Sequence, residues 1–129
     1  MRALPILILL AGCAATSPTN PQASREGLSR ELAGLAAGEP RDCLPSTTSG
    51  QNLTVVDSDT LVYREGSTIW VNQLRAACPG LRPLDAILVE TQTGQYCRGD
   101  HIRSIEPLGT RSIPGPVCFL GQFTPHRPR

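Results

Sequence analysis

Downstream of residue 42 the apolar residues come in short runs that often alternate with polar ones, and this period of two indicates β-strands. The pattern predicts strands over 53–57, 60–64, 67–71, 86–91, 95–99, 101–106 and 117–123. Turn residues at 65–66 and at 92–94 predict two hairpins. We therefore expect residues 42–123 to form a mainly β domain, a small antiparallel sandwich or partly closed barrel of about six short strands.

Upstream of this domain the pattern changes twice. Residues 14–24 are rich in Ser, Thr, Pro and Asn without apolar periodicity, which predicts a flexible tether. In 24–38 three leucines recur at i, i+4 and i+7, and this spacing predicts a short helix between Ser24 as a cap and Gly38 as a stop. At the other end, we predict that 124–129 form a disordered tail.

The first residues, "MRALPILILLAGC", place Arg2 before an apolar run that ends in small residues and Cys13. The run is shorter than the roughly 20 residues that span a bilayer, and its alternative interpretation is a buried segment of the core. "LAGC" at 10–13 resembles the lipobox of a bacterial lipoprotein signal peptide. The resemblance implies removal of 1–12, lipidation of Cys13 and residence in the outer membrane facing the periplasm, with 13–41 as a lipidated tether. Whether the true start lies upstream of Met1 stays open.

Four cysteines remain for the domain: Cys43, Cys78, Cys97 and Cys118. An even number in an oxidising compartment predicts two disulfides. A zinc site is the alternative, but the sequence lacks the closely spaced CxxC or HxxxH pairs that such sites use. Three pairings are possible, and we favour Cys78–Cys97 with Cys43–Cys118.

Several motifs follow Cys43 along the chain in this order: "VDSDTLVY", "VNQL", "CPGL", "CRGDHI" and "CFLGQF". In this order, after Cys43, they resemble a family of small secreted or lipidated proteobacterial proteins of unknown function. The resemblance implies a shared scaffold and transfers no activity.

The charge balance argues against nucleic acid as a partner. All 12 basic residues are arginine, and they are scattered along the chain. Without 1–12, eleven arginines would balance eleven acidic residues, so a mature chain would have no long-range attraction for polyanions. No motif for a cofactor or a metal ion stands out, and "DSDT" at 57–60 is interpreted as a turn rather than a calcium site.

Four residues are candidates for a binding site: Trp70, Arg98, Asp100 and His101. His101 could act as a general base oriented by Asp100 or Asp85, but adjacent residues of a strand point to opposite faces, so Asp100 is expected to cap a turn instead. On a strand Trp70 points to the face opposite its apolar neighbours Ile69 and Val71, so it is either an exposed anchor or part of the core. We expect a non-enzymatic binding module of the envelope; the alternatives are a small periplasmic enzyme using His101 and a purely structural envelope component.

Overall fold

The computed structural model describes residues 12, 20–45, 53–83, 85–105 and 115–129. Within these ranges one helix precedes eight strands. Their bounds are α1 Pro21–Leu32, β1 Leu35–Ala37, β2 Thr54–Val55, β3 Thr60–Glu65, β4 Thr68–Gln73, β5 Ala86–Glu90, β6 His101–Ile105, β7 Cys118–Phe119 and β8 Phe123–Pro128. The prediction of a mainly β domain with a short N-terminal helix is confirmed.

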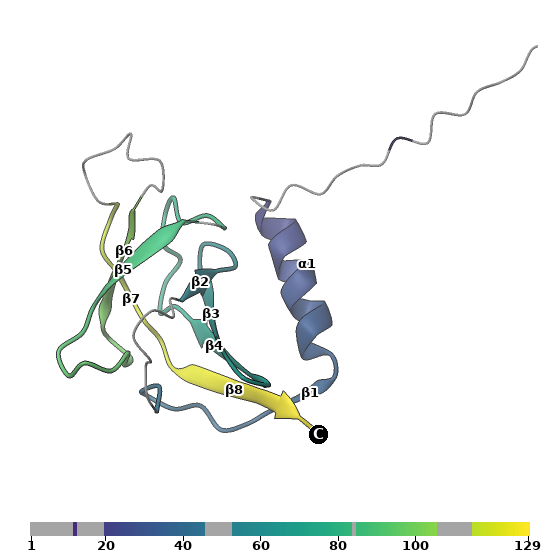
Figure 1. Ribbon diagram of the computed structural model, residues 1–129. Coiled ribbons are helices and arrows are strands. Elements are labelled where there is room, and N and C mark those ends of the chain that lie inside the picture. Colours follow the sequence, from purple (N-terminus) through teal and green to yellow (C-terminus); the bar gives the residue numbers. More distant parts are fainter. Residues whose placement is uncertain (1–11, 13–19, 46–52, 84, 106–114) are drawn as a thin grey trace, which may run out of the picture.

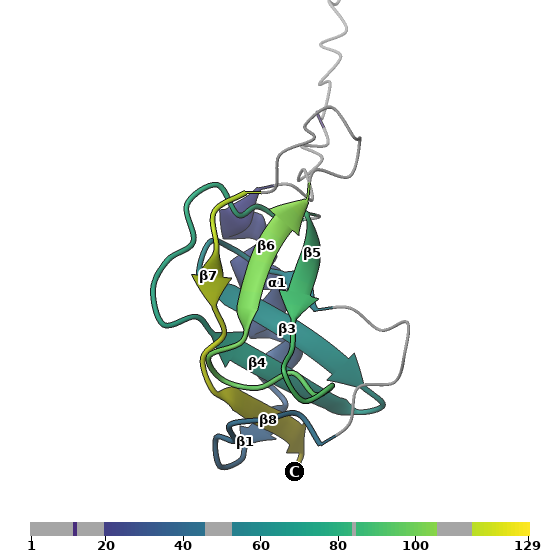
Figure 2. The same cartoon turned by 90° about the vertical axis from the view of Figure 1, so that its left-hand side faces the viewer.

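The strands form two antiparallel sheets. A five-stranded sheet has the order β1-β8-β4-β3-β2, and a three-stranded sheet has the order β5-β6-β7. Figure 1 shows the three-stranded sheet on one side of the five-stranded sheet and α1 on the other, and in Figure 2 the strands of the two sheets cross. The sheets do not close into a barrel, so the sandwich is the correct alternative.

The core lies between the two sheets. Its largest fully buried side chains come from both sheets and from the connections, because each sheet contributes one apolar face. They include Trp70, Tyr63, Phe123, Leu44, Leu61, Ile102 and Leu120. The chain is only 4% aromatic, and three of its five aromatic residues are concentrated here. Trp70, which the sequence left between two environments, is 2% exposed and therefore belongs to the core.

The predicted hairpin around residue 66 is present. Glu65 pairs with Thr68, which leaves a two-residue turn, and Gly66 takes a φ of 56° that side chains rarely adopt. The second predicted hairpin is wrong. β5 pairs with β6, Glu90 opposite His101, instead of with residues 95–99. A strand over 95–99 is excluded by a turn in which the N–H of Asp100 donates to the carbonyl of Cys97, next to Gly99 at a φ of 88°.

The predicted disorder of 124–129 is also wrong, because β8 fills the place between β1 and β4. Pro125 lies opposite Trp70, and Pro128 lies opposite Leu35. The two prolines made the segment look unlike a strand, since proline cannot donate to a sheet. Here the prolines are separated by residues that keep their own N–H groups, and the buried ring of Pro125 lies against the core.

The helix begins and ends earlier than predicted. Asn20 caps α1, its Oδ1 accepting from the N–H of Gln22 at 2.9 Å, and Pro21 occupies the first turn. The segment after α1, expected to be helical, forms β1 instead. None of the residues of α1 is fully buried. Two ion pairs connect α1 to the domain: Arg25 to Asp57 at 3.5 Å, and Glu31 to Arg64 at 2.9 Å.

Two disulfides are present, but the favoured pairing is wrong. The bonds are Cys43–Cys97 and Cys78–Cys118. The segment around Cys43 runs beside 96–98, where the N–H of Leu44 donates to the carbonyl of Tyr96 at 2.9 Å. Because 95–99 lies in a loop and not in a hairpin, Cys97 faces this first segment, and Cys78 is left to meet Cys118 in the core.

Candidate functional site

The residues proposed from the sequence do not form one site. Trp70 is buried, with Arg127 placed over its ring at 5.6 Å, so its interpretation as an exposed anchor is wrong. Arg98 lies 3.9 Å from Asp42, and both side chains are exposed. Only His101 stands on an exposed surface that brings together side chains from several strands.

Asp100 has the role of a turn cap, as predicted. Its Oδ2 accepts a hydrogen bond of 2.8 Å from the N–H of Cys97. Asp85, the other carboxylate proposed for His101, accepts from the N–H of Arg82 at 2.9 Å in a turn of its own. Neither aspartate therefore orients the imidazole.

The carboxylate nearest to His101 is one that the sequence did not suggest. Glu90 lies directly across from His101 in the sheet, and its Oε2 is 4.0 Å from His101 Nδ1. On the other side Phe119 is the cross-strand partner, and the two rings meet edge to face at 4.9 Å. The sequence signal was present in the alternation of 86–90 and 101–105, but it depended on the correct pairing of the two strands.

A second row of the same surface is formed by Leu88 and Arg103, which are also paired across β5 and β6. The Nε of Arg103 is 3.8 Å from Oε1 of Glu90, beyond hydrogen-bond distance. This nitrogen is shielded from solvent and has no hydrogen-bond partner among the described residues. Glu90 therefore stands between His101 and Arg103 and holds both only by long contacts.

We call this surface the outer face: the solvent side of the three-stranded sheet, with Leu88, Glu90, His101, Arg103, Ile105, Val117 and Phe119. Strand alternation directs Ile87, Val89 and Ile102 to the core and the intervening residues outward. Leu88 and Phe119 are each 45% exposed, Ile105 is 40% exposed and Val117 is 37% exposed. Among the described residues these four are the exposed large hydrophobic side chains; three of them lie on strands of this sheet, and Val117 directly precedes β7.

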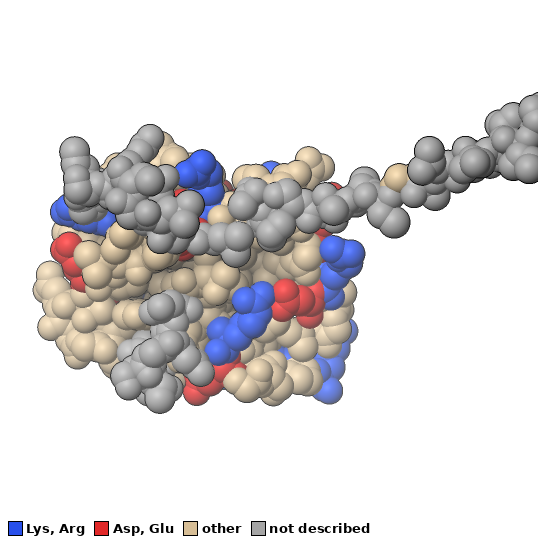
Figure 3. Space-filling model, turned by 45° about the horizontal axis from the view of Figure 1, so that its top comes forward, with Lys and Arg blue, Asp and Glu red and all other residues tan. Residues whose placement is uncertain are grey.

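An antiparallel sheet with one solvated face normally carries polar residues there. Single exposed apolar residues are common and need no explanation, whereas a contiguous group marks an interaction surface. The charged groups of the outer face have both signs, and the surface shown in Figure 3 likewise has acidic and basic side chains interspersed. Such a surface suits contact with another protein better than attraction of a polyanion.

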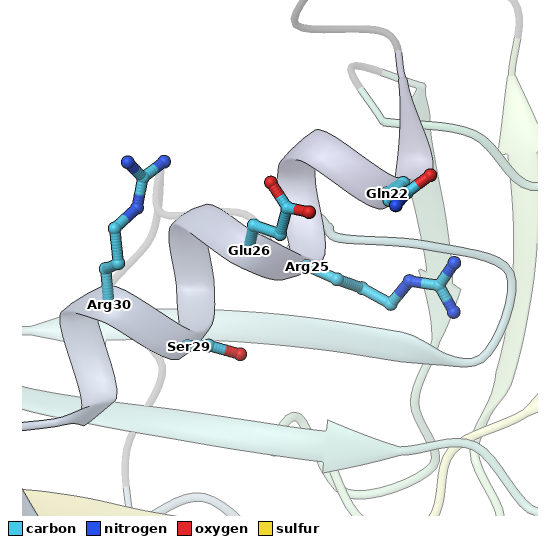
Figure 4. Close-up of a pocket in the computed structure, with 5 residues that line it drawn as sticks. All are labelled: Gln22, Arg25, Glu26, Ser29 and Arg30. Atoms are coloured by element: carbon cyan, nitrogen blue, oxygen red, sulfur yellow. The ribbon is translucent and has the colours of Figure 1, made fainter.

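The hollows of the molecule fit a small ligand less well. One at the end of the outer face, lined in part by Glu90, Asp100 and His101, measures about 230 Å³, below the usual 300–1,000 Å³ of ligand pockets. A larger hollow of about 640 Å³ is lined by residues of α1 alone. Figure 4 shows Arg25 and Arg30 of this hollow pointing in different directions, so its polar groups do not converge.

A third hollow, about 470 Å³, lies between α1 and the adjoining strands and is lined by Leu28, Val56 and Val62 among others. Val62 is buried because α1 covers the face of β3 that points away from the core. Within the described ranges no three His, Cys, Asp or Glu side chains are grouped so as to hold a metal ion. The same residues contain no helix long and apolar enough to cross a membrane.

Fold and site together define a small disulfide-linked β-sandwich domain with one solvent-exposed sheet face on which apolar side chains lie beside charged groups of both signs. By sequence the chain belongs to a family of unknown function, DUF6491, which it matches over residues 1–120. Comparison with curated proteins and with solved structures gave no match. This match agrees with the resemblance to a family of unknown function that the cysteine and turn motifs indicated.

Proposed function

We propose that this protein is a lipid-anchored binding module of the cell envelope, and that a partner protein docks on the outer face. The observation that carries the proposal is the exposure of Leu88, Ile105 and Phe119 on the solvent side of one sheet, with the exposed Val117 directly before β7. At about 25 cal/mol per Å², leaving four large apolar side chains in water has a cost that docking would recover.

The outer face combines apolar side chains with the charged and polar groups of its central strand β6, a mixture that suits contact with another protein. Phenylalanine and arginine are enriched at the centre of protein interfaces, and Phe119 and Arg103 occupy neighbouring rows here. The Nε of Arg103, which lacks a hydrogen-bond partner within the described part of the chain, would gain from a carbonyl or carboxylate of the partner. In the complex Phe119 would be buried against the partner, and the hydrogen bond of Arg103 would orient the partner on the outer face.

The anchor rests on the sequence at 10–13, because Cys13 lies outside the described residues. Four of the five cysteines are paired in disulfides, which leaves Cys13 as the one available for a thioether to lipid. Disulfides persist in compartments such as the periplasm, which is consistent with this address. A second candidate, an enzyme using His101, has the weaker support of a long contact to Glu90 and a small hollow.

Site-specific photo-crosslinking in cells tests the docking face. The full chain carries a photoreactive amino acid at Ile105, on the outer face, or at Arg75, an exposed residue of the other sheet's connection. We expect discrete crosslinked species from Ile105 and none of them from Arg75. Replacing Phe119 by serine in the Ile105 reporter should abolish these species. The same bands from both positions, or bands indifferent to Phe119→Ser, would contradict the proposal.

The variant His101→Ala separates binding from catalysis. In the binding proposal His101 matters through its contact with Phe119, so His101→Ala and Phe119→Ser should weaken the crosslinks and any cellular phenotype in parallel. An enzyme predicts the opposite order, with His101→Ala removing the phenotype while the crosslinks and the fold remain.

A further inference from the structure

The three-stranded sheet ends in an edge strand of unusual character. β5 pairs only with β6 among the described residues, and its five residues read Ala-Ile-Leu-Val-Glu. Proteins protect such edges with very short strands, Lys, Pro or bulges, because an open apolar edge pairs with other chains. The other three edges are protected by length: β1 has three residues, and β2 and β7 have two each. β5 is five residues long and contains no Lys, Pro or bulge, and its one charged residue, Glu90, is at its end.

The pairing of β6 shows which backbone groups of β5 point toward its open edge. The carbonyl of Asp100 accepts a hydrogen bond from the β7 side at 3.0 Å, so the backbone of Asp100 faces β7. Successive residues of a strand face opposite neighbours, so His101 faces β5, where Glu90 is its partner. Counting back along β5 by the same alternation, Val89 and Ile87 direct their N–H and C=O groups away from β6, toward the open edge.

We propose that two copies of this chain pair β5 against β5, antiparallel, about a twofold axis through Leu88. This register is the one in which all five residues of the strand are paired. It places Ile87 of one copy opposite Val89 of the other, so that the outward backbone groups of both strands meet. The two three-stranded sheets then become one six-stranded sheet, and the proposal does not depend on the docking of another protein.

The side chains are compatible with this twofold register. Leu88 meets the Leu88 of the second copy on the outer face, and Glu90 lies opposite Ala86, so no like charges face each other directly. Ile87 and Val89 point to the core yet are only partly buried, since they lie at the open edge. Pairing would cover them and would join the two outer faces into one apolar surface. A strand of another protein could bind the same backbone groups, but its pairing would not need β5 to be complementary to itself, as β5 is in this twofold register.

The register is tested with the full chain carrying a single added cysteine. Opposite residues of a non-hydrogen-bonded pair bring their Cβ atoms to about 4.5–5.5 Å, close enough for a disulfide with small adjustment. We expect Leu88→Cys to give a covalent dimer under mild oxidation. Ala86→Cys alone should give no covalent dimer, although residue 86 lies on the same strand and on the same face as residue 88. A mixture of Ala86→Cys and Glu90→Cys chains should form the crosslinked heterodimer. A peptide map of the product, digested without reduction, must show the two introduced cysteines joined to each other and both native bridges retained, which excludes disulfide exchange.

A matched pair of charge variants tests the interface without crosslinking. Leu88→Lys places two ammonium groups opposite each other and should raise the dissociation constant of the dimer by about tenfold or more, measured by sedimentation. Phe119→Lys changes a residue of equal exposure on the same face, two strands from the edge, and should leave the dimer intact. Circular dichroism and a melting curve confirm that both variants fold.

Each other outcome overturns the proposal. A Leu88→Cys product whose mass is not twice that of the chain would identify a foreign strand at β5. Equal dimer yields from Leu88→Cys and Ala86→Cys would exclude this register, and loss of the dimer in Phe119→Lys would place the contact on the outer face instead of the edge. The docking proposal has a separate readout, because crosslinks from Ile105 are scored as hetero-species and not as dimers.

Discussion

The two disulfides should contribute to stability in different ways, although they close loops of similar size. The bridges span 54 residues for Cys43–Cys97 and 40 residues for Cys78–Cys118. In the chain-entropy model each of these loops corresponds to about 4 kcal/mol, with a difference of only about 0.3 kcal/mol in favour of the longer one. Loop entropy alone therefore predicts that removing either bridge costs nearly the same free energy of unfolding.

Burial separates the two bridges. Cys78 is 2% exposed and Cys118 is 7% exposed, both within the core cluster, whereas Cys43 and Cys97 are only partly buried. Replacing a bridge by two serines places hydroxyl groups where the sulfur atoms were, and a buried hydroxyl without a partner costs about 1–3 kcal/mol. We expect the serine pair at Cys78 and Cys118 to lose about 2–6 kcal/mol more than the serine pair at Cys43 and Cys97.

Alanine pairs isolate the hydroxyl contribution, because alanine removes the same bond and adds no polar group. At Cys78 and Cys118 the alanine pair should have a free energy of unfolding about 2 kcal/mol or more above that of the serine pair. At Cys43 and Cys97 the serine and alanine pairs should agree within about 0.5 kcal/mol, as expected for partly solvated positions.

Urea unfolding measures all four variants with one probe, since Trp70 is the only tryptophan and is buried in the folded state. The reasoning is refuted if serine and alanine are equivalent at Cys78 and Cys118. It is also refuted if the larger difference between serine and alanine appears at Cys43 and Cys97. The first result would mean that water reaches the Cys78–Cys118 bridge. The second would mean that Cys43–Cys97 is the more deeply buried of the two bridges.

Three further outcomes are expected. Gly121→Ala should lower the free energy of unfolding by about 3 kcal/mol or more, because a Cβ there would overlap the backbone oxygen of Gln73; a smaller loss in urea unfolding would mean that the two segments separate easily. Burial, reinforced by Asp59, raises the pKa of Asp57, so the folded state favours its protonated form and loses stability as the pH rises through that pKa. Asp57→Asn should therefore gain stability relative to the natural chain over that interval and match it at low pH; a difference constant with pH would contradict this assignment. Intact mass of the detergent-extracted protein should give a triacylated chain that begins at Cys13 and takes up no alkylating agent without reduction, whereas an unlipidated full-length chain would exclude the anchor.

The parts of the fold that depend on local patterns could be predicted from the sequence. β3 and β4 have clear alternation on both sides of Gly66, and a glycine at a positive φ is what a tight hairpin requires. β8 could not be predicted by the same logic, because Pro125 and Pro128 argue against a strand while tertiary packing on Trp70 favours one. Proline marks where a backbone donor is missing, but it does not show whether a neighbouring strand needs that donor.

The candidate site was predictable only in part, for a related reason. His101 was identified by its residue type, but Glu90 and Phe119 become its neighbours only through the order and register of three strands. Register is a non-local property: a strand shifted by one residue turns every side chain to the opposite face. No spacing in the sequence relates residues 90, 101 and 119.

One short turn accounts for three of these differences at once. The hydrogen bonds between Asp100 and Cys97 end the extended backbone at 97–100 and lengthen the connection after β5. β6, which follows the turn, therefore pairs with β5 in place of the strand predicted over 95–99, and this pairing brings Glu90 to His101. The turn also leaves Cys97 beside Cys43, so the remaining two cysteines must pair in the core. The polar residues of this stretch build the scaffold, and the surface available for a partner is the sheet face that the turn sets in place.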